Sequence, residues 1–470
     1  MSSLSQLSNW QPATRHAAPT TARSINPVLA RLDAAAAAQP STIVTLSPEA
    51  IAAASAPLTT SQRYRDVGAE MLKQLGTGSV IPLEHAKLPE DVDNRFTLSI
   101  ATKNGARVDL TLADVDGEMI YQVGSSAELN DDERKAMSDL AKGFQAAIDG
   151  MTGSSPAVRI GGLTQFDSKL VQSIDFHAEV AGPDSTTQTL DFHIDEAMRK
   201  VSVAGADGKA EVNVDTSTME HAGTKQQQSK AISSYLAQFD QAVARGHGDK
   251  KLMSMFKDAF SDLNRTAIAE SREDFLTKPS KWQLNSGDRS ALTGLSDFSA
   301  SVSQTPKSSN PRKDWEKDTF SYVVSQETRI DGTSHEDRKI AQSQQSQLSA
   351  KYHADVGKSS PPFFDGTLET QNYDYHQIED SARSDVSVNY RLGKLKSASL
   401  QQMASQSEQV QTFILGKLKS EKAIPGQQSL VRDLLPALTS YESIKGDDAL
   451  DGNTLLLGLP GELVARSEQF

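Results

Sequence analysis

Apolar residues fall at every second position over several stretches in the middle of this chain, and that pattern constrains its fold most strongly. Residues 96–100 and 108–112 each alternate apolar with polar side chains, and Asn104-Gly105 lies between them. A period of two places the apolar side chains on one face of a β-strand, and Asn-Gly favours a tight turn between two strands. We therefore predict a β-hairpin here, with one face buried.

The same alternation recurs further along the chain. Four short runs, over residues 174–180, 190–194, 200–204 and 210–215, are separated by brief connections. Longer runs rich in Ser and Gln follow within residues 292–400. Strands that are joined by short turns pair antiparallel, so both regions are predicted to form β-meanders.

Amphipathic helices are predicted between the strands. Apolar residues recur three and four positions apart over 63–75, 131–150 and 225–264, which is typical of helices with one buried stripe. Asn130 followed by Glu133 predicts a capping box at one helix start, and Gly246-His247-Gly248 interrupts the last stretch. The predicted fold class is therefore α+β, with antiparallel β-meanders packed on amphipathic helices.

Composition divides the chain into three parts. Residues 1–60 form a Ser/Ala/Pro-rich leader with little apolar surface to bury, so we predict that it is disordered. Residues 61–222 are expected to form an α+β domain, and residues 223–470 a helical connector plus a second α+β domain. Gly162-Leu163-Thr164 and Leu292-Thr293-Gly294 are similar and both precede a predicted meander. Duplication of one helix-plus-meander unit is therefore an alternative to two unrelated domains.

Charge and cysteine content exclude several classes of protein. The 61 acidic residues outnumber the 48 basic ones without a basic stripe, so no nucleic-acid partner is expected. The absence of cysteine excludes disulfides, thiolate metal sites and thiol nucleophiles. No run approaches the ~20 apolar residues of a membrane-spanning helix, and no Sec-type signal is visible. We expect a protein that is cytoplasmic or secreted without a Sec signal.

Two Asp-Phe-His triplets are the most notable chemical motif. Phe176 and Phe192 occupy the same alternate positions as the other apolar residues of their strands. The Asp and His residues on either side of each Phe therefore lie together on the opposite face of the sheet. If Val180 pairs with Gln188, His177 lies opposite Asp191 and Asp175 lies opposite His193. These four residues are weak candidates for a metal site, and opposite-charge pairs on a solvated sheet face are the favoured interpretation.

Gly246-His247-Gly248-Asp249 contains a His-Gly-Asp triplet that is similar to the catalytic signature of lactate and malate dehydrogenases. In that family the histidine exchanges a proton with the substrate hydroxyl, a role that would fall to His247. Here Gly replaces the acidic or amide residue before the histidine, and Lys250 replaces a hydroxyl residue. No Gly-x-Gly-x-x-Gly follows a predicted strand, so no cofactor is expected. His247 therefore stays a weak catalytic candidate.

The whole chain resembles an uncharacterised, pseudomonad-like bacterial protein family. The resemblance rests on four stretches, which are Ser41 to Ala50, Leu129 to Phe144, Leu163 to Phe176 and Ala291 to Val302. Members of that family can carry a lactate dehydrogenase name. The resemblance implies no particular fold, activity or site residue.

Two classes of function are consistent with these observations. The first is a non-enzymatic interaction or structural protein with a protein partner, exported by a route that needs no signal peptide or retained in the cell. The second is an enzyme whose Asp, Glu and His residues come together only in the fold, with a lactate/malate dehydrogenase-like activity as its least favoured form. The sequence determines neither the oligomeric state nor the identity of a substrate or partner.

Overall fold

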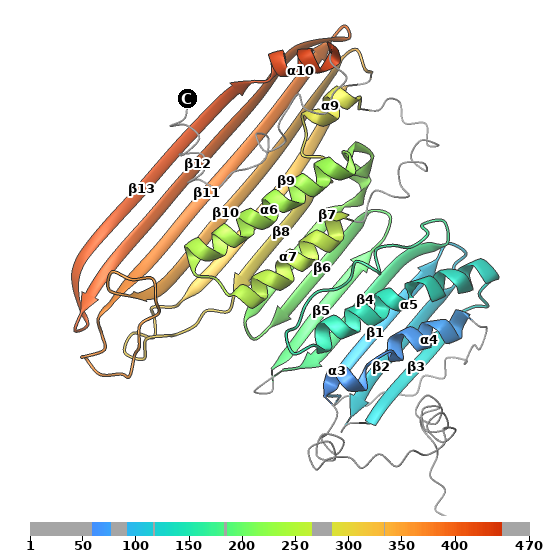
Figure 1. Cartoon of the computed structure of the whole chain (residues 1–470), viewed down its shortest axis with the longest axis horizontal. Helices are drawn as coiled ribbons and strands as arrows, with labels where there is room; N and C mark the ends of the chain where they lie inside the picture. The colour runs from blue at the N-terminus through green and yellow to red at the C-terminus, as the bar shows by residue number, and fades with distance from the viewer. Residues whose placement is uncertain are drawn as a thin grey trace, which may run out of the picture. The chain divides into compact units, whose positions relative to one another are not determined.

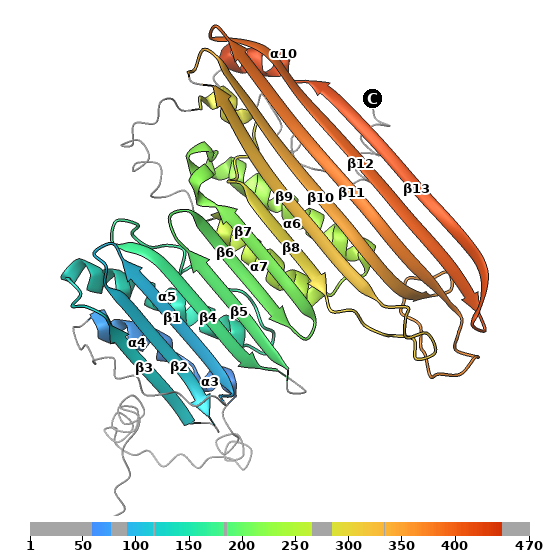
Figure 2. The same cartoon turned by 180° about the vertical axis from the view of Figure 1, so that it is seen from behind.

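The computed structural model describes residues 59–76, 92–115, 118–182, 186–265, 284–332 and 334–443. Nearly all of the predicted leader, residues 1–60, lies outside the described residues. Within them, the dominant element is a single antiparallel sheet of 13 strands, which Figures 1 and 2 show from opposite sides. This confirms the antiparallel strands and the packed helices that the sequence predicts, with the sheet as the larger part.

The last five strands, of 14 to 21 residues, are longer than the first eight, of 7 to 11 residues. The first eight are β1 (Asn94–Thr102), β2 (Arg107–Val115), β3 (Glu118–Ser125), β4 (Val171–Ala181), β5 (Thr187–Ile194), β6 (Met198–Gly205), β7 (Gly208–Asp215) and β8 (Phe298–Gln304). The last five are β9 (Thr319–Gly332), β10 (Arg338–Asp355), β11 (Tyr373–Arg391), β12 (Lys394–Ile414) and β13 (Lys417–Asp433). From β4 to β13 each strand pairs with the next, and β4 also pairs with β1, so β3 and β13 form the two edges.

The helices lie on one face of the sheet, in front in Figure 1 and behind in Figure 2. They are α3 (Thr60–Arg63), α4 (Val67–Gly76), α5 (Asp131–Thr152), α6 (Lys225–Gly246), α7 (Lys250–Arg265), α9 (Ser286–Ser290) and α10 (Leu435–Ser443), with a 3-10 turn η2 at Thr216–His221. The predicted capping box at Asn130 and Glu133 starts α5, and both of its hydrogen bonds are present. None of the described helices is long and apolar enough to cross a membrane.

A smaller apolar cluster, which includes Leu292, Ile340 and Leu438, lies near α9 and α10. The largest apolar core lies between the other helices and the sheet. It extends from Tyr64, ahead of α4, to Ile378 of β11, and the large side chains at its centre include Phe144, Phe239 and Phe260. Strand β7 pairs with β8, so strands on both sides of residue 222 share this sheet and this core. The proposed boundary between 222 and 223, and the duplication, stay predictions.

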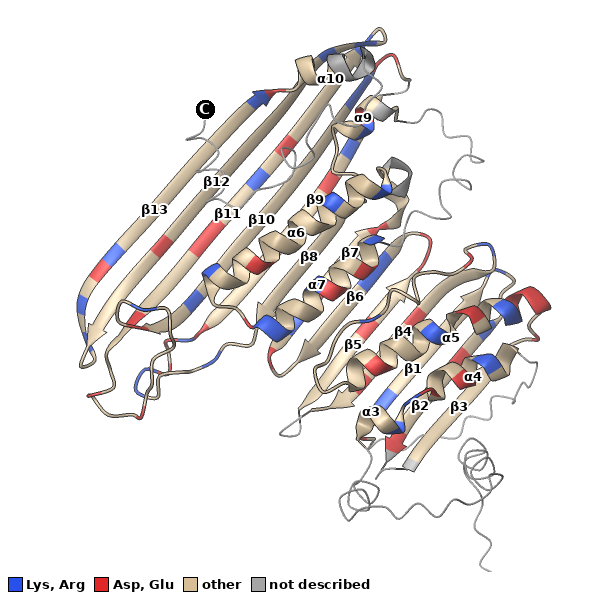
Figure 3. Ribbon diagram, viewed as in Figure 1, with Lys and Arg blue, Asp and Glu red and all other residues tan. Residues whose placement is uncertain are grey.

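The two faces of the sheet differ in chemistry. We call the face under the helices the covered face and the opposite one the open face. In β10 the even-numbered residues up to Ala350 are buried on the covered face, whereas the odd-numbered ones are more exposed. The open face of β12 is mostly Ser and Gln, whereas β10 and β11 also place charged and aromatic side chains there. Cross-strand neighbours on this face include Gln345 with Ser325 and Ser381 with Ser405. Figure 3 shows charged residues of both signs scattered along the long strands, without a patch of one sign.

Candidate functional site

The two Asp-Phe-His triplets meet in the predicted register. Val180 pairs with Gln188, and the pairing therefore sets His177 opposite Asp191 and Asp175 opposite His193. The Nδ1 atom of each histidine lies 2.6 Å from an Oδ1 atom of its cross-strand aspartate. The motif is thus a symmetric pair of His–Asp contacts on the open face of β4 and β5.

These contacts are partly exposed ion pairs. A second carboxylate touches the Nε2 atom of each histidine, Glu179 at 3.4 Å from His177 and Asp195 at 3.2 Å from His193. Partial burial opposes protonation of His193, but its bonds to Asp175 and Asp195 outweigh this and raise its pKa above the usual value. In the described part of the chain, no three His, Asp or Glu residues converge to hold a metal ion.

His247 ends α6 and lies at the mouth of a groove. Its backbone has φ +53°, a left-handed conformation that closes the helix, and its ring stacks on Tyr352 with ring centroids 3.9 Å apart. Tyr352 stacks in turn on His376. Burial, then the neighbouring His376, lowers the pKa of His247, so its ring is neutral at pH 7. The groove, of about 590 Å³, runs between α6 and α7 and is lined also by Asp240 and Lys257.

The surroundings of His247 do not match a dehydrogenase site. Arg245, two residues before His247, is already paired with Asp380 at 2.9 Å and Glu408 at 2.8 Å. Every pairing among the described strands is antiparallel, whereas a dinucleotide site of that family requires parallel strands with crossover helices. The contacts that His247 makes among the described residues are those of a helix cap and of a ring stacked on Tyr352.

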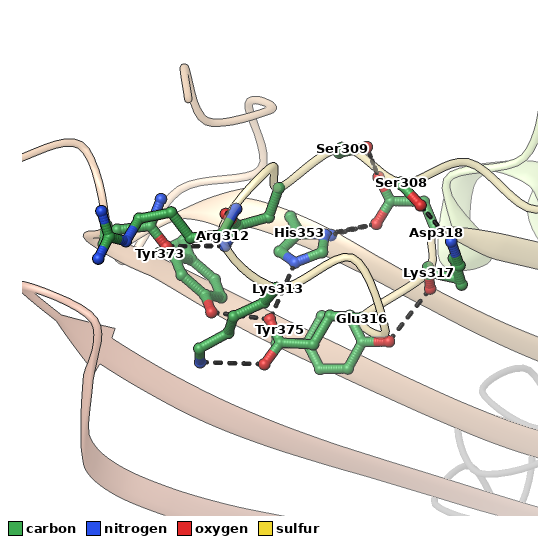
Figure 4. A network of polar contacts seen from close by, with 12 residues as sticks. Ser308, Ser309, Arg312, Lys313, Glu316, Lys317, Asp318, His353, Tyr373 and Tyr375 are labelled. Carbon is green, nitrogen blue, oxygen red and sulfur yellow. Dashed lines mark hydrogen bonds and ion pairs between the residues drawn. The ribbon is translucent and has the colours of Figure 1, made fainter. Parts of the chain in front are cut away.

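A buried histidine that the sequence did not single out lies at the far end of β10. The Nδ1 atom of His353 is 2.6 Å from Asp318 and its Nε2 atom is 3.2 Å from Glu316, as Figure 4 shows. The Tyr373 hydroxyl donates to Glu316 at 2.7 Å, and the Lys313 ammonium donates to it at 3.0 Å. Burial opposes the charge on His353, but the two carboxylates raise its pKa above the usual value.

This His353 network attaches a loop to the open face. Its acidic members come from the segment between β8 and β9, whereas His353 and Tyr373 belong to β10 and β11. Tyr373, Tyr375 and Phe413 form a small apolar cluster beside it, and the Lys313 ammonium lies 3.3 Å from the ring centre of Phe413. Both imidazole nitrogens have carboxylate partners and the side chain is fully buried, so no substrate reaches it. The network is structural.

The edge strand β13 presents unpaired backbone on its outer side, where no described strand pairs with it. Leu434 donates its N–H to the Ala398 carbonyl at 2.9 Å, one residue beyond the Asp433–Ser399 pair. Bonded and non-bonded pairs alternate in an antiparallel ladder. From residue 420 onward, even-numbered residues therefore bond to β12, and odd-numbered residues direct N–H and C=O outward.

The two halves of this edge differ. Pro425 occupies an outward position, where it has no N–H to offer, and three lysines precede it, at 417, 419 and 422. Lysine and proline on an edge strand hinder pairing with another chain. Residues Gly426–Asp433, which we call the edge window, contain no Lys or Pro, carry Arg432 and Asp433 as their only charges, and expose Val431 by 71%. The edge window is the candidate interface.

Comparison with known proteins identifies no relative. No family model, no curated protein and no solved structure matches the chain. The function must therefore be argued from the described residues themselves.

Proposed function

We propose that this chain is a non-enzymatic interaction protein that binds an extended segment of another polypeptide along its edge window. The partner segment would add one antiparallel strand to the sheet beside β13. Main-chain hydrogen bonds supply the affinity in this mode of recognition, and alternate side chains supply the specificity. The observation that carries the proposal is the row of outward backbone groups at Gln427, Ser429, Val431 and Asp433.

The surrounding residues support this function. Lysine and proline protect edge strands from pairing with other chains, and within β13 they occur only before Gly426. The edge window also belongs to a rigid element, because β12 pairs with β13 from Lys417 to Asp433. A partner strand would therefore meet preformed hydrogen-bonding groups with little ordering cost on this side.

A photo-crosslinking experiment in the native host tests the proposal. A photoreactive phenylalanine at Val431 is expected to form adducts with a polypeptide partner. The matched control carries the same group at Gln401, an exposed residue that pairs with Val431 one strand further inside the sheet. Adducts of equal yield at both positions, or none at Val431, would contradict the proposal.

A backbone variant separates strand addition from simple proximity. Ser429→Pro removes one outward N–H. Pro425 shows that an odd-numbered position of β13 can hold proline without loss of a hydrogen bond to β12. We expect Ser429→Pro to abolish the adduct at Val431, whereas Ser429→Ala retains it. Circular dichroism and thermal unfolding of both variants establish that the fold is kept. An adduct that survives Ser429→Pro would show that strand addition is not involved.

A further inference from the structure

We infer that the partner strand comes from a second copy of this chain, so that two edge windows pair antiparallel around a two-fold axis at Leu430. This inference rests on the proposed function, because it names the occupant of the same edge. Backbone hydrogen bonds between the two β13 strands require that an odd-numbered, outward residue of one copy faces an odd-numbered residue of the other. An axis at Leu430 satisfies this, since Gln427 then faces the partner copy's Asp433 and Ser429 faces its Val431.

Hydrogen bonding favours this register. Each bonded pair exchanges two backbone hydrogen bonds, and the four outward residues Gln427, Ser429, Val431 and Asp433 all find a bonded pair. Pro425 stays outside the overlap. A pairing over the full strand would instead place its axis at Pro425, so two residues without N–H would face each other at the centre.

Charge favours the same register. With the axis at Leu430, Arg432 faces the partner copy's Gln428 and Asp433 faces its Gln427, so no like charges are opposed. An axis at Gln427 would set Glu421 against Asp433 and Lys422 against Arg432, and like charges directly opposite destabilise a sheet. The lysine-bearing first half of each β13 then extends away from the overlap.

Apolar side chains add to the pairing. Leu430 is half-buried on the covered face and would meet the partner copy's Leu430 in a non-bonded pair, where side chains are closest. On the open face, Val431 would lie beside the partner copy's Ser429. A two-fold interface of this kind closes after two copies, and the result is a dimer rather than a fibre.

The absence of cysteine permits a direct test with the full chain. A single Leu430→Cys would place two thiols across the axis about 4.5 Å apart at Cα, within the range of a disulfide. The matched control is Gln428→Cys, which has the same strand, face and partial burial. In the dimer, the two cysteines at position 428 would lie about 13 Å apart, because each faces residue 432 of the partner copy, four residues away along the strand. We expect Leu430→Cys to form roughly tenfold more disulfide-linked dimer under mild oxidation.

Light scattering after gel filtration measures the oligomeric state without any crosslink. The unmodified chain is expected at twice the monomer mass, falling toward the monomer on dilution, and Ser429→Pro is expected to be monomeric. A monomer at every concentration, or equal crosslinking of both cysteine variants, would overturn the second-copy proposal. An adduct at Val431 with a different protein would then leave strand addition standing, whereas the absence of any adduct would end both proposals.

Discussion

His353 shows how a charged group is accommodated at the end of a polar strand. Its fully buried imidazole lies between Asp318 and Glu316, and each carboxylate has a further donor, such as Tyr373 on Glu316. A buried charge is tolerated only when it is paired and hydrogen-bonded. The contacts of His353 with Asp318 and Glu316 thus hold the loop that carries both acids against β10.

Replacing His353 by Gln is expected to destabilise the protein by about 3 kcal/mol, because the buried Glu316 and the partly exposed Asp318 lose the imidazole that pairs with both. The matched control is His177→Gln, which removes a histidine with the same 2.6 Å contact to an aspartate but at a third-exposed site. That change is expected to cost under about 1 kcal/mol. Urea unfolding of both variants measures the difference, and equal losses would contradict the role given to His353.

The difference in the free energy of unfolding between wild type and His353→Gln is also expected to depend on pH. The pKa of His353 is raised above 6.5 in the folded protein, so its contribution is complete below pH 6.5 and is lost as the pH rises through the folded-state value. Burial works against ionisation of Glu316, but His353, Tyr373 and Lys313 lower its pKa below 4.5, so its contribution is lost only as the pH falls through that lower value. The stability difference is therefore expected to be larger near pH 6 than near pH 9, and a larger difference at pH 9 would contradict this assignment.

Among the elements, α5 depends on close backbone contact rather than on side chains alone. A Cβ atom on Gly143, in the middle of α5, would lie 2.4 Å from the carbonyl carbon of Gly162. The helix therefore packs directly against the segment that leads into β4. Ala is otherwise preferred over Gly in a helix by about 1 kcal/mol, so glycine here reflects space and not helix propensity.

Gly143→Ala is accordingly expected to destabilise the protein by about 2 kcal/mol, because the backbone of Gly162 has to move. Gly153→Ala, at the end of the same helix, is the control, since its Cβ would make only contacts of 3.4 Å or longer. That variant is expected to be within about 0.5 kcal/mol of wild type. Chemical denaturation measures both changes, and a neutral Gly143→Ala would show that α5 and the segment do not approach so closely.

At the scale of the whole molecule, the continuity of the sheet is the main feature. The ladder between β7 and β8 joins strands on either side of residue 222, and the apolar core is shared by α4, α5, α6 and α7. A shared core and an unbroken ladder couple the opening of neighbouring elements. The described strands around this ladder are therefore expected to unfold together.

Hydrogen exchange tests that expectation. The slowest amides of β4 and of β8 are expected to exchange with the same free energy, because both open only in the global unfolding of one body. If the slowest amides before residue 222 and those after it exchanged with two different free energies, the two parts would be independently folding domains. Exchange at several denaturant concentrations, read by mass spectrometry, distinguishes the two outcomes.

Local pattern alone predicted much of the secondary structure. The period of two predicted the antiparallel strands, Asn130 with Glu133 predicted the start of α5, and the glycines around His247 predicted the break between α6 and α7. The alternation also predicted that the Asp and His side chains of the two triplets share one face, and the register considered for them, with Val180 opposite Gln188, is the one in the structure. These features depend on residues close in sequence, whose geometry follows from the chain itself.

Other features were decided only by the tertiary structure. His353 meets Asp318 from 35 positions away and Glu316 from 37, and no spacing in the sequence links them. The same holds for the pairing of β7 with β8 and for the place of β13 at an edge, which makes its outward backbone groups available. Alternation shows which face of a strand is buried, but not which strand lies beside it, because that choice depends on how distant segments pack together.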